Sequence, residues 1–99
     1  MDVTYRIDKD ILYISIEGRI DSSNAGVAEE KIFSIKKENP GKHTVIDADK
    51  LEYISSAGLR VILKLRKEEP KLAIINVAAD VYDVFEMTGF TDMVTVEKA

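Results

Sequence analysis

The chain enters its most strongly patterned helix through the stretch Tyr53-Ile54-Ser55-Ser56-Ala57-Gly58-Leu59-Arg60. Either Ser55 or Ser56 can be the N-cap, because a serine oxygen accepts a hydrogen bond from an N–H group of the first helical turn. Gly58 has no side chain and leaves the backbone open to approach by another group. The helix dipole places partial positive charge there, which favours an anion such as a phosphate carried by one of the serines. The stretch therefore predicts either a simple helix cap or a loop that tolerates an anion.

The helix that follows this entrance is predicted from about residue 57 to about residue 69, and it has an apolar and a basic face at about 100° per residue. The apolar face contains Leu59, Ile62, Leu63 and Leu65, with Val61 at its edge. The outer face carries Arg60, Lys64 and Lys67. A basic stripe of this kind is typical of a solvated helix face. Beside an anion-tolerant helix start, it could also dock an acidic partner.

The segments before this helix predict a hairpin, a helix and a strand. Residues 3–7 and 11–17 are short runs rich in β-branched and aromatic residues, typical of a β-hairpin. The capping cluster Ser22-Ser23-Asn24 begins a helix that continues to about residue 38, where Asn39-Pro40-Gly41 stops it. Residues 43–48 predict the next strand, with Asp47 near its end, and residues 51–54 are assigned to a brief connection.

The segments after the helix complete an α/β pattern. Residues 72–77 form an apolar run suited to a central strand, Asp80 is expected to cap a third helix that ends near Gly89, and residues 93–96 predict a last strand. The predicted order is β-β-α-β-α-β-α-β in a single domain spanning residues 1–99. Strands separated by helices imply right-handed crossovers and parallel pairing. We therefore expect an α/β fold with one mixed central β-sheet and the helices packed mainly on one face.

Composition narrows the classes of function. With 99 residues, 45% of them hydrophobic, the chain fits one globular domain with a single core. A net charge of −4 and a pI of about 5.0 argue against binding to nucleic acid or to a membrane surface. The chain has no cysteine, which excludes a disulfide framework and a thiolate metal site. Because we find no signal pattern and no apolar run of spanning length, we expect a soluble, cytoplasmic protein.

The sequence gives little sign of catalysis. His43 is the only histidine, so no second histidine completes a metal site, and no glycine-rich nucleotide motif occurs. Neither serine lies in a G-x-S-x-G elbow, which disfavours an α/β-hydrolase. We therefore expect no catalytic residue, no metal and no cofactor. Four carboxylates could gather near the serine loop if the strand ends meet there: Asp21, Asp47, Asp49 and Glu52.

Three segments carry a resemblance that extends over essentially the whole chain. They are VIDADKLEYISSAGLRVIL at 45–63, GRIDSSNA at 18–25 and DVFEMTGF at 83–90. Together and in register, they resemble the STAS family, in particular the bacterial anti-sigma-factor antagonists. The helix entrance of that family reads Asp-Ser-Ser/Thr-Gly-Leu-Gly, and an anti-sigma factor that is also a serine kinase phosphorylates the serine after the aspartate.

The resemblance implies that Ser56 is the phosphorylated residue, with Ser55 as the second choice. The match is made on the shared Gly-Leu pair. It also implies that Asp47 corresponds to the polar residue at the end of the third strand and Asp21 to the aspartate in the turn after the second. The partner-binding residues that it implies are Asp21, Asp47, Ser55, Ser56, Ala57, Gly58, Arg60 and Lys64. The resemblance also implies a C-terminal helix after the last strand, for which a chain ending at Ala99 leaves little room.

Two positions depart from the motif of the family. Ser55 stands where the family has aspartate, which removes a negative charge beside the acceptor serine and could alter recognition by the kinase. Arg60 stands where the family has glycine. This cation lies about one helical turn from Ser56, where it could pair with a phosphate or contact a partner.

The function implied by the resemblance is that of an anti-sigma-factor antagonist. The unmodified domain would bind an anti-sigma factor that is also a serine kinase, and so release a sigma factor for transcription. Phosphorylation of Ser56 would switch the domain off, and a serine phosphatase would be a further partner. The domain itself would be no enzyme, and we expect a monomer or a weak dimer. Two alternatives stay open: a constitutive STAS adaptor of a transport or signalling assembly, and an enzyme with Ser56 as its nucleophile.

Overall fold

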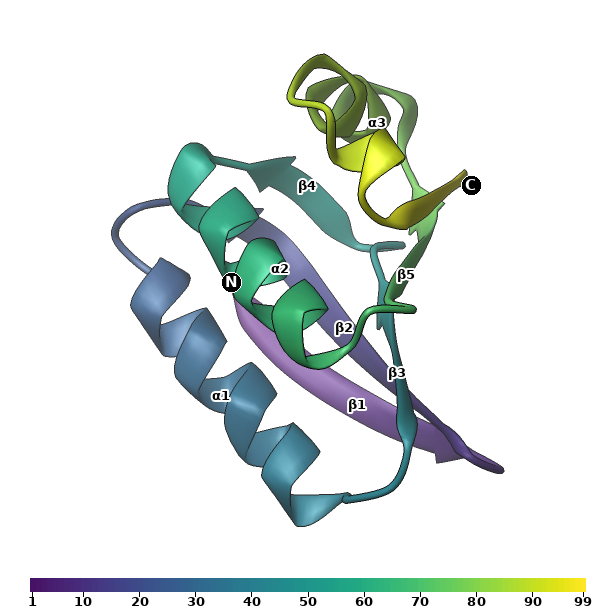
Figure 1. Cartoon of the computed structure of the whole chain (residues 1–99). Helices are drawn as coiled ribbons and strands as arrows, with labels where there is room; N and C mark the ends of the chain where they lie inside the picture. The colour runs from purple at the N-terminus through teal and green to yellow at the C-terminus, as the bar shows by residue number, and fades with distance from the viewer.

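The computed structural model describes residues 1–99 as one α/β domain (Figure 1). Its elements are β1 (Asp2–Asp8), β2 (Ile11–Ile20), α1 (Ala25–Glu38), β3 (His43–Asp47), β4 (Leu51–Ile54), α2 (Ser56–Glu68), β5 (Ala73–Val77), α3 (Ala79–Met87), a short 3-10 helix η1 (Phe90–Asp92) and β6 (Thr95–Lys98). β1 pairs antiparallel with β2, and every other strand pair is parallel. The predicted fold class, an α/β domain with a mixed sheet, is therefore confirmed.

The helices lie mainly on one side of this sheet. The strand order is β1-β2-β3-β5-β6, and β4 pairs with β2 off that path. Figure 1 shows α1 and α2 side by side across one face, while α3 stands at the end where β4 lies. A single cluster of 23 buried residues fills the space between sheet and helices. No helix combines the length and the apolar character that a membrane crossing needs.

Strand β4 is the element that the predicted order lacks. It forms because β2 is ten residues long and β3 covers only the part from Ile11 to Ser15. The chain then turns through residues 48–50 and pairs again along the end of β2, with Arg19 opposite Tyr53. In β4 the terminal residues Leu51 and Ile54 are buried and the two between them are exposed. The prediction of a brief connection at 51–54 is therefore wrong.

The apolar face of α2 is rotated from its predicted position. Val61, which was expected at the edge, is only 2% exposed, whereas Leu63 is half-buried at the margin of the core. The buried face is centred nearer to Val61 than predicted. The reason is that Gly58 is also buried and brings the first turn of α2 against the sheet. Leu63 consequently lies toward the basic side of the helix.

The third helix and the last strand also differ from their predicted limits. The helix begins at Ala79 with Ala78 as its N-cap. Asp80 therefore lies inside the first turn, where its Oδ1 accepts a hydrogen bond from the backbone N–H of Val81 at 3.0 Å. The last strand occupies residues 95–98 instead of 93–96 because η1 precedes it.

Candidate functional site

The two serines at the start of α2 have different roles. Ser55 is the N-cap, with an extended backbone, and its Oγ accepts a hydrogen bond from the N–H of Gly58 at 3.3 Å. Ser56 is the first residue of the helix and is exposed. Its hydroxyl makes no hydrogen bond within the protein, because Ser55 already satisfies the capping requirement. The serine loop thus presents one free hydroxyl at the positive end of a helix dipole.

The loop between β2 and α1 lies directly beside the serine loop. The backbone N–H of Ser55 donates a hydrogen bond to the carbonyl of Ile20 at 3.0 Å, and Ile20 pairs with Ile54 in the sheet. The ends of the parallel strands β2 and β4 therefore bring the two loops together. Asp21, which follows Ile20, lies beside the serine loop, as expected if the strand ends meet there. Asn24 closes the loop between β2 and α1, because its Oδ1 accepts a hydrogen bond from the backbone N–H of Asp21 at 2.9 Å.

Asp21 is held as a carboxylate by local hydrogen bonds. Its Oδ1 accepts one bond from the Ser23 hydroxyl at 2.6 Å and another from the Ser23 backbone N–H at 2.9 Å. These bonds, the hydroxyl bond first, lower the pKa of Asp21 below the ordinary aspartate value of 3.8. The carboxylate is therefore charged throughout the neutral pH range and adds a negative charge at the edge of the serine loop.

Gly58 faces the core. A Cβ at this position would lie 2.7 Å from Cγ1 of Ile54 and 3.0 Å from Cγ2 of Ile20, closer than ordinary contact. The expectation that Gly58 leaves the backbone open to a partner is wrong, because the ends of β2 and β4 already fill that space. The glycine instead allows α2 to begin against those two strand ends, and so it positions the serine loop.

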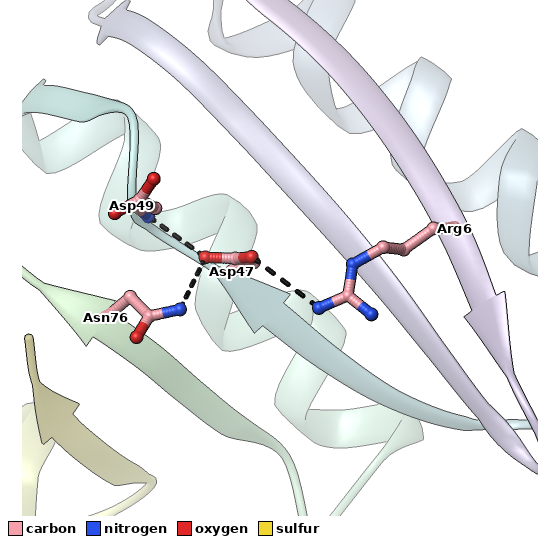
Figure 2. Close-up of polar contacts among 4 residues, drawn as sticks. All are labelled: Arg6, Asp47, Asp49 and Asn76. Carbon is pink, nitrogen blue, oxygen red and sulfur yellow. Dashed lines mark hydrogen bonds and ion pairs between the residues drawn. The ribbon is translucent and has the colours of Figure 1, made fainter.

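Asp47 lies away from the serine loop, and Figure 2 shows its side chain on the face of the sheet opposite the helices. It pairs with Ser15 of β2, whereas the serine loop is beside Ile20, five residues farther along the strand. At about 3.3 Å per residue, this separates the two positions by roughly 17 Å along β2. The expectation that Asp47 joins the serine loop is therefore wrong, and the cause is β4, which carries the chain onward before α2 begins.

The Asp47 carboxylate instead ties together three parts of the sheet. Its Oδ1 accepts from the N–H of Asp49 and from Nδ2 of Asn76, both at 3.1 Å, and its Oδ2 lies 4.0 Å from Nη2 of Arg6. Figure 2 shows these groups converging from β1, the turn after β3 and β5. Asn76 has a left-handed backbone with a φ of 58°, which is uncommon outside glycine. The hydrogen bond from its side chain helps to hold that conformation.

Asp47→Ala is accordingly expected to lower the free energy of unfolding by about 1 to 2 kcal/mol, since each lost hydrogen bond contributes roughly 1 kcal/mol. Urea denaturation followed by circular dichroism measures this change. We expect binding at the serine loop to be unaffected at temperatures where the variant is folded. A loss of partner binding without a loss of stability would contradict this structural role.

The outer face of α2 continues from the serine loop. Arg60 is exposed and lies one helical turn beyond Ser56. Lys64 forms an ion pair with Glu29 of α1, with 2.9 Å between Nζ and Oε1. Arg60 and Lys64 thus share a surface with Ser56, as the sequence predicted. Ala57, also expected at this surface, is half-buried between it and the core.

One pair of side chains near the serine loop was not predicted from the sequence. The Arg19 guanidinium stacks on the Tyr53 ring, 4.2 Å from its centroid, and Tyr53 is 39% exposed. Both residues point away from the core because Ile20 and Ile54 beside them point into it. Recognising β4 in the sequence would have revealed this cross-strand pair.

The arrangement around the serine loop suits binding more than acid–base chemistry. No side chain is hydrogen-bonded to the Ser56 hydroxyl, so no general base is in place to activate it. His43 lies at the opposite end of the sheet, where its Nδ1 is 2.7 Å from Oε1 of Glu69. No group of three or more potential metal ligands is arranged around an ion site.

Known proteins resemble this chain in sequence and in fold. The family model of the STAS domain matches residues 2–99. The protein BtrV of Bordetella bronchiseptica, a proposed anti-sigma factor antagonist, is 32% identical over 90 aligned residues, which cover 87% of this chain and 77% of BtrV.

Two solved structures share the fold at low sequence identity. An anti-sigma factor antagonist from Mycobacterium paratuberculosis superposes with a TM-score of 0.87 at 18% identity, covering 99% of this chain and 86% of that one. The anti-sigma factor antagonist SpoIIAA in its unphosphorylated form superposes with a TM-score of 0.69 at 13% identity, covering 99% and 89%. At these identities the likeness concerns the fold alone.

Proposed function

The chain belongs to the STAS domain family, and from this membership we propose that it is an anti-sigma-factor antagonist switched off by phosphorylation of Ser56. Its relative BtrV is a proposed antagonist of this class, and SpoIIAA, which shares the fold, was solved in a form described as unphosphorylated. The partner is an anti-sigma factor that is also a serine kinase. The domain works by binding, as a cytoplasmic regulator of sigma-dependent transcription, and a serine phosphatase resets it.

The observation that carries this proposal is the division of roles between the two serines. Ser55 caps α2, which leaves the Ser56 hydroxyl exposed and without a hydrogen-bond partner. A phosphoryl group can therefore be added without breaking the cap. The new charge of about −1.5 to −2 meets the positive end of the helix dipole, so the helix tolerates it.

The chemistry of the switch is a phosphoryl transfer for which the kinase supplies ATP and magnesium. Ser56 Oγ attacks the γ-phosphorus, the bond to the β–γ bridging oxygen breaks, ADP leaves, and the hydroxyl proton passes to a base of the kinase. The phosphate then occupies the surface to which the partner binds. Exclusion by bulk and charge is sufficient for the switch, because nothing in the fold needs to unfold.

Phosphosite mapping tests this proposal. We expect mass spectrometry to find one phosphoryl group, on Ser56, after incubation with the serine-kinase anti-sigma factors of the host and ATP. Ser56→Ala should abolish it. Ser55→Ala is the matched control and should still be phosphorylated, although loss of the cap costs about 1 kcal/mol of stability.

A Ser56→Ala variant that is phosphorylated like the parent would contradict the assignment of Ser56. No modification under any of these conditions would favour the constitutive adaptor, which uses the same surface without a switch. Replacement of the motif aspartate by Ser55 is the observation that supports this second candidate.

A further inference from the structure

We propose that a basic hollow on the outer side of α2 docks an acidic segment of the partner, carrying one apolar anchor. This inference rests on the proposed function, since the partner in question is the anti-sigma factor. The hollow is open to solvent, has a volume of about 260 Å³, and is lined by Arg60, Leu63, Lys64, Arg66 and Lys67. Four cations thus line one hollow on a chain whose net charge is −4.

Two of these cations lack a partner within the protein. Lys64 is paired with Glu29, and Nε of Arg66 donates to the carbonyl of Met93 at 2.7 Å. Arg60 and Lys67 are exposed and take part in no ion pair. Charge complementarity therefore favours an occupant with carboxylates that reach these two side chains.

The hollow also offers apolar contact. Leu63 is half-buried at the margin of the core, on the side of α2 where the cations lie. The aliphatic stems of the lysines and arginines add apolar surface around it. With a volume below the roughly 300–1,000 Å³ of small-molecule sites, the hollow fits a protruding side chain. The occupant is thus a protein segment with an apolar side chain between acidic ones.

The position of the hollow connects it to the switch. Arg60 lines the hollow and lies one helical turn from Ser56, within reach of a phosphate on that serine. A phosphate there would repel the carboxylates of the docked segment and compete with them for Arg60. This accounts for how one modification excludes the partner while α2 keeps its structure.

Binding measurements on a charge-reversed variant test the docking. The probe is the anti-sigma factor that phosphorylates Ser56, titrated with the unmodified domain in a calorimeter at two salt concentrations. Arg60→Glu/Lys67→Glu is expected to raise Kd by about tenfold and to reduce its salt dependence. Lys31→Glu/Lys37→Glu on α1 makes the same change in net charge at two exposed lysines outside the hollow, and it should bind like the parent.

The neutral variant Arg60→Gln/Lys67→Gln keeps the test valid if the charge reversal disturbs α2, and it should raise Kd about threefold. Equal binding by the parent and both hollow variants would overturn the docking and leave the proposed function standing. Equal weakening by the α1 control would also overturn it, because net charge alone would then explain the effect. If the unmodified domain binds no anti-sigma factor, the proposed function fails, and the docking fails with it.

Discussion

Phosphorylated on Ser56, the domain is expected to bind its anti-sigma factor about a hundredfold more weakly than the unmodified domain. This corresponds to about 2.7 kcal/mol. A misplaced charge at an interface can cost several kcal/mol. The charge also falls one turn from Arg60, where an acidic partner would otherwise be attracted. Calorimetric titration of the anti-sigma factor with both forms of the domain measures the difference.

Two single aspartate substitutions show whether the position of a negative charge, and not only its presence, decides binding to the anti-sigma factor. Ser56→Asp carries one negative charge and should weaken binding by about tenfold, less than the phosphate does. Ser55→Asp places the same charge one residue earlier, where aspartate is a good N-cap and where the STAS motif has it, and it should bind like the parent. Equal affinity of Ser56→Asp and the parent would show that electrostatic exclusion is the wrong mechanism.

The switch should leave the stability of the domain almost unchanged. An anion in the first turn of a helix is favoured by about 0.3–1 kcal/mol, and Ser56 makes no hydrogen bond that a substitution could break. The urea midpoint of Ser56→Asp is therefore a check that weaker binding reflects the interface. This separation of stability from binding follows from the role of Ser55 as the cap.

The parts of the structure set by local pattern could be predicted from the sequence. The β-hairpin was predicted from the β-branched and aromatic runs at residues 3–7 and 11–17, and the two segments pair as β1 and β2. The helix entrance at Ser55 was found because capping depends on residues close in sequence. The sequence could not show which of the two serines is the N-cap. Both carry the same hydroxyl oxygen, and they differ only in the backbone geometry that the fold imposes.

The parts that depend on pairing between distant segments could not be predicted. The short β4 has little pattern of its own, and it exists because β2 extends beyond β3. Without β4, Asp47 was placed at the end of the sheet nearest the serine loop. The contact of Gly58 with Ile20 and Ile54 was missed for the same reason. The register of strand pairing is set only when the sheet folds. A glycine in a sequence likewise does not show which atoms would contact a Cβ at its position.

Gly58→Ala is expected to destabilise the domain by about 1–2 kcal/mol. Alanine in place of glycine within a helix ordinarily adds up to about 1 kcal/mol of stability. Here the new Cβ would lie 2.7 Å from Ile54 Cγ1 and 3.0 Å from Ile20 Cγ2. Forcing an extra carbon into a packed core costs about 1–3 kcal/mol. An approach of 2.7 Å places Gly58→Ala in the upper part of that range, about 2–3 kcal/mol, which outweighs the gain. Urea unfolding monitored by circular dichroism gives the free energy directly.

Gly26→Ala in α1 is the matched control, because a Cβ there meets no atom within 4 Å. It should stabilise the domain by about 0.5 kcal/mol, so the two substitutions are expected to have opposite signs. Relief of the clash at Gly58 requires α2 to move away from the ends of β2 and β4, and Ser56 would move with it. We therefore expect Gly58→Ala to slow phosphorylation of Ser56 even where the variant is folded. If Gly58→Ala were as stabilising as the control, the strand ends would not constrain Gly58, and a partner could approach its backbone after all.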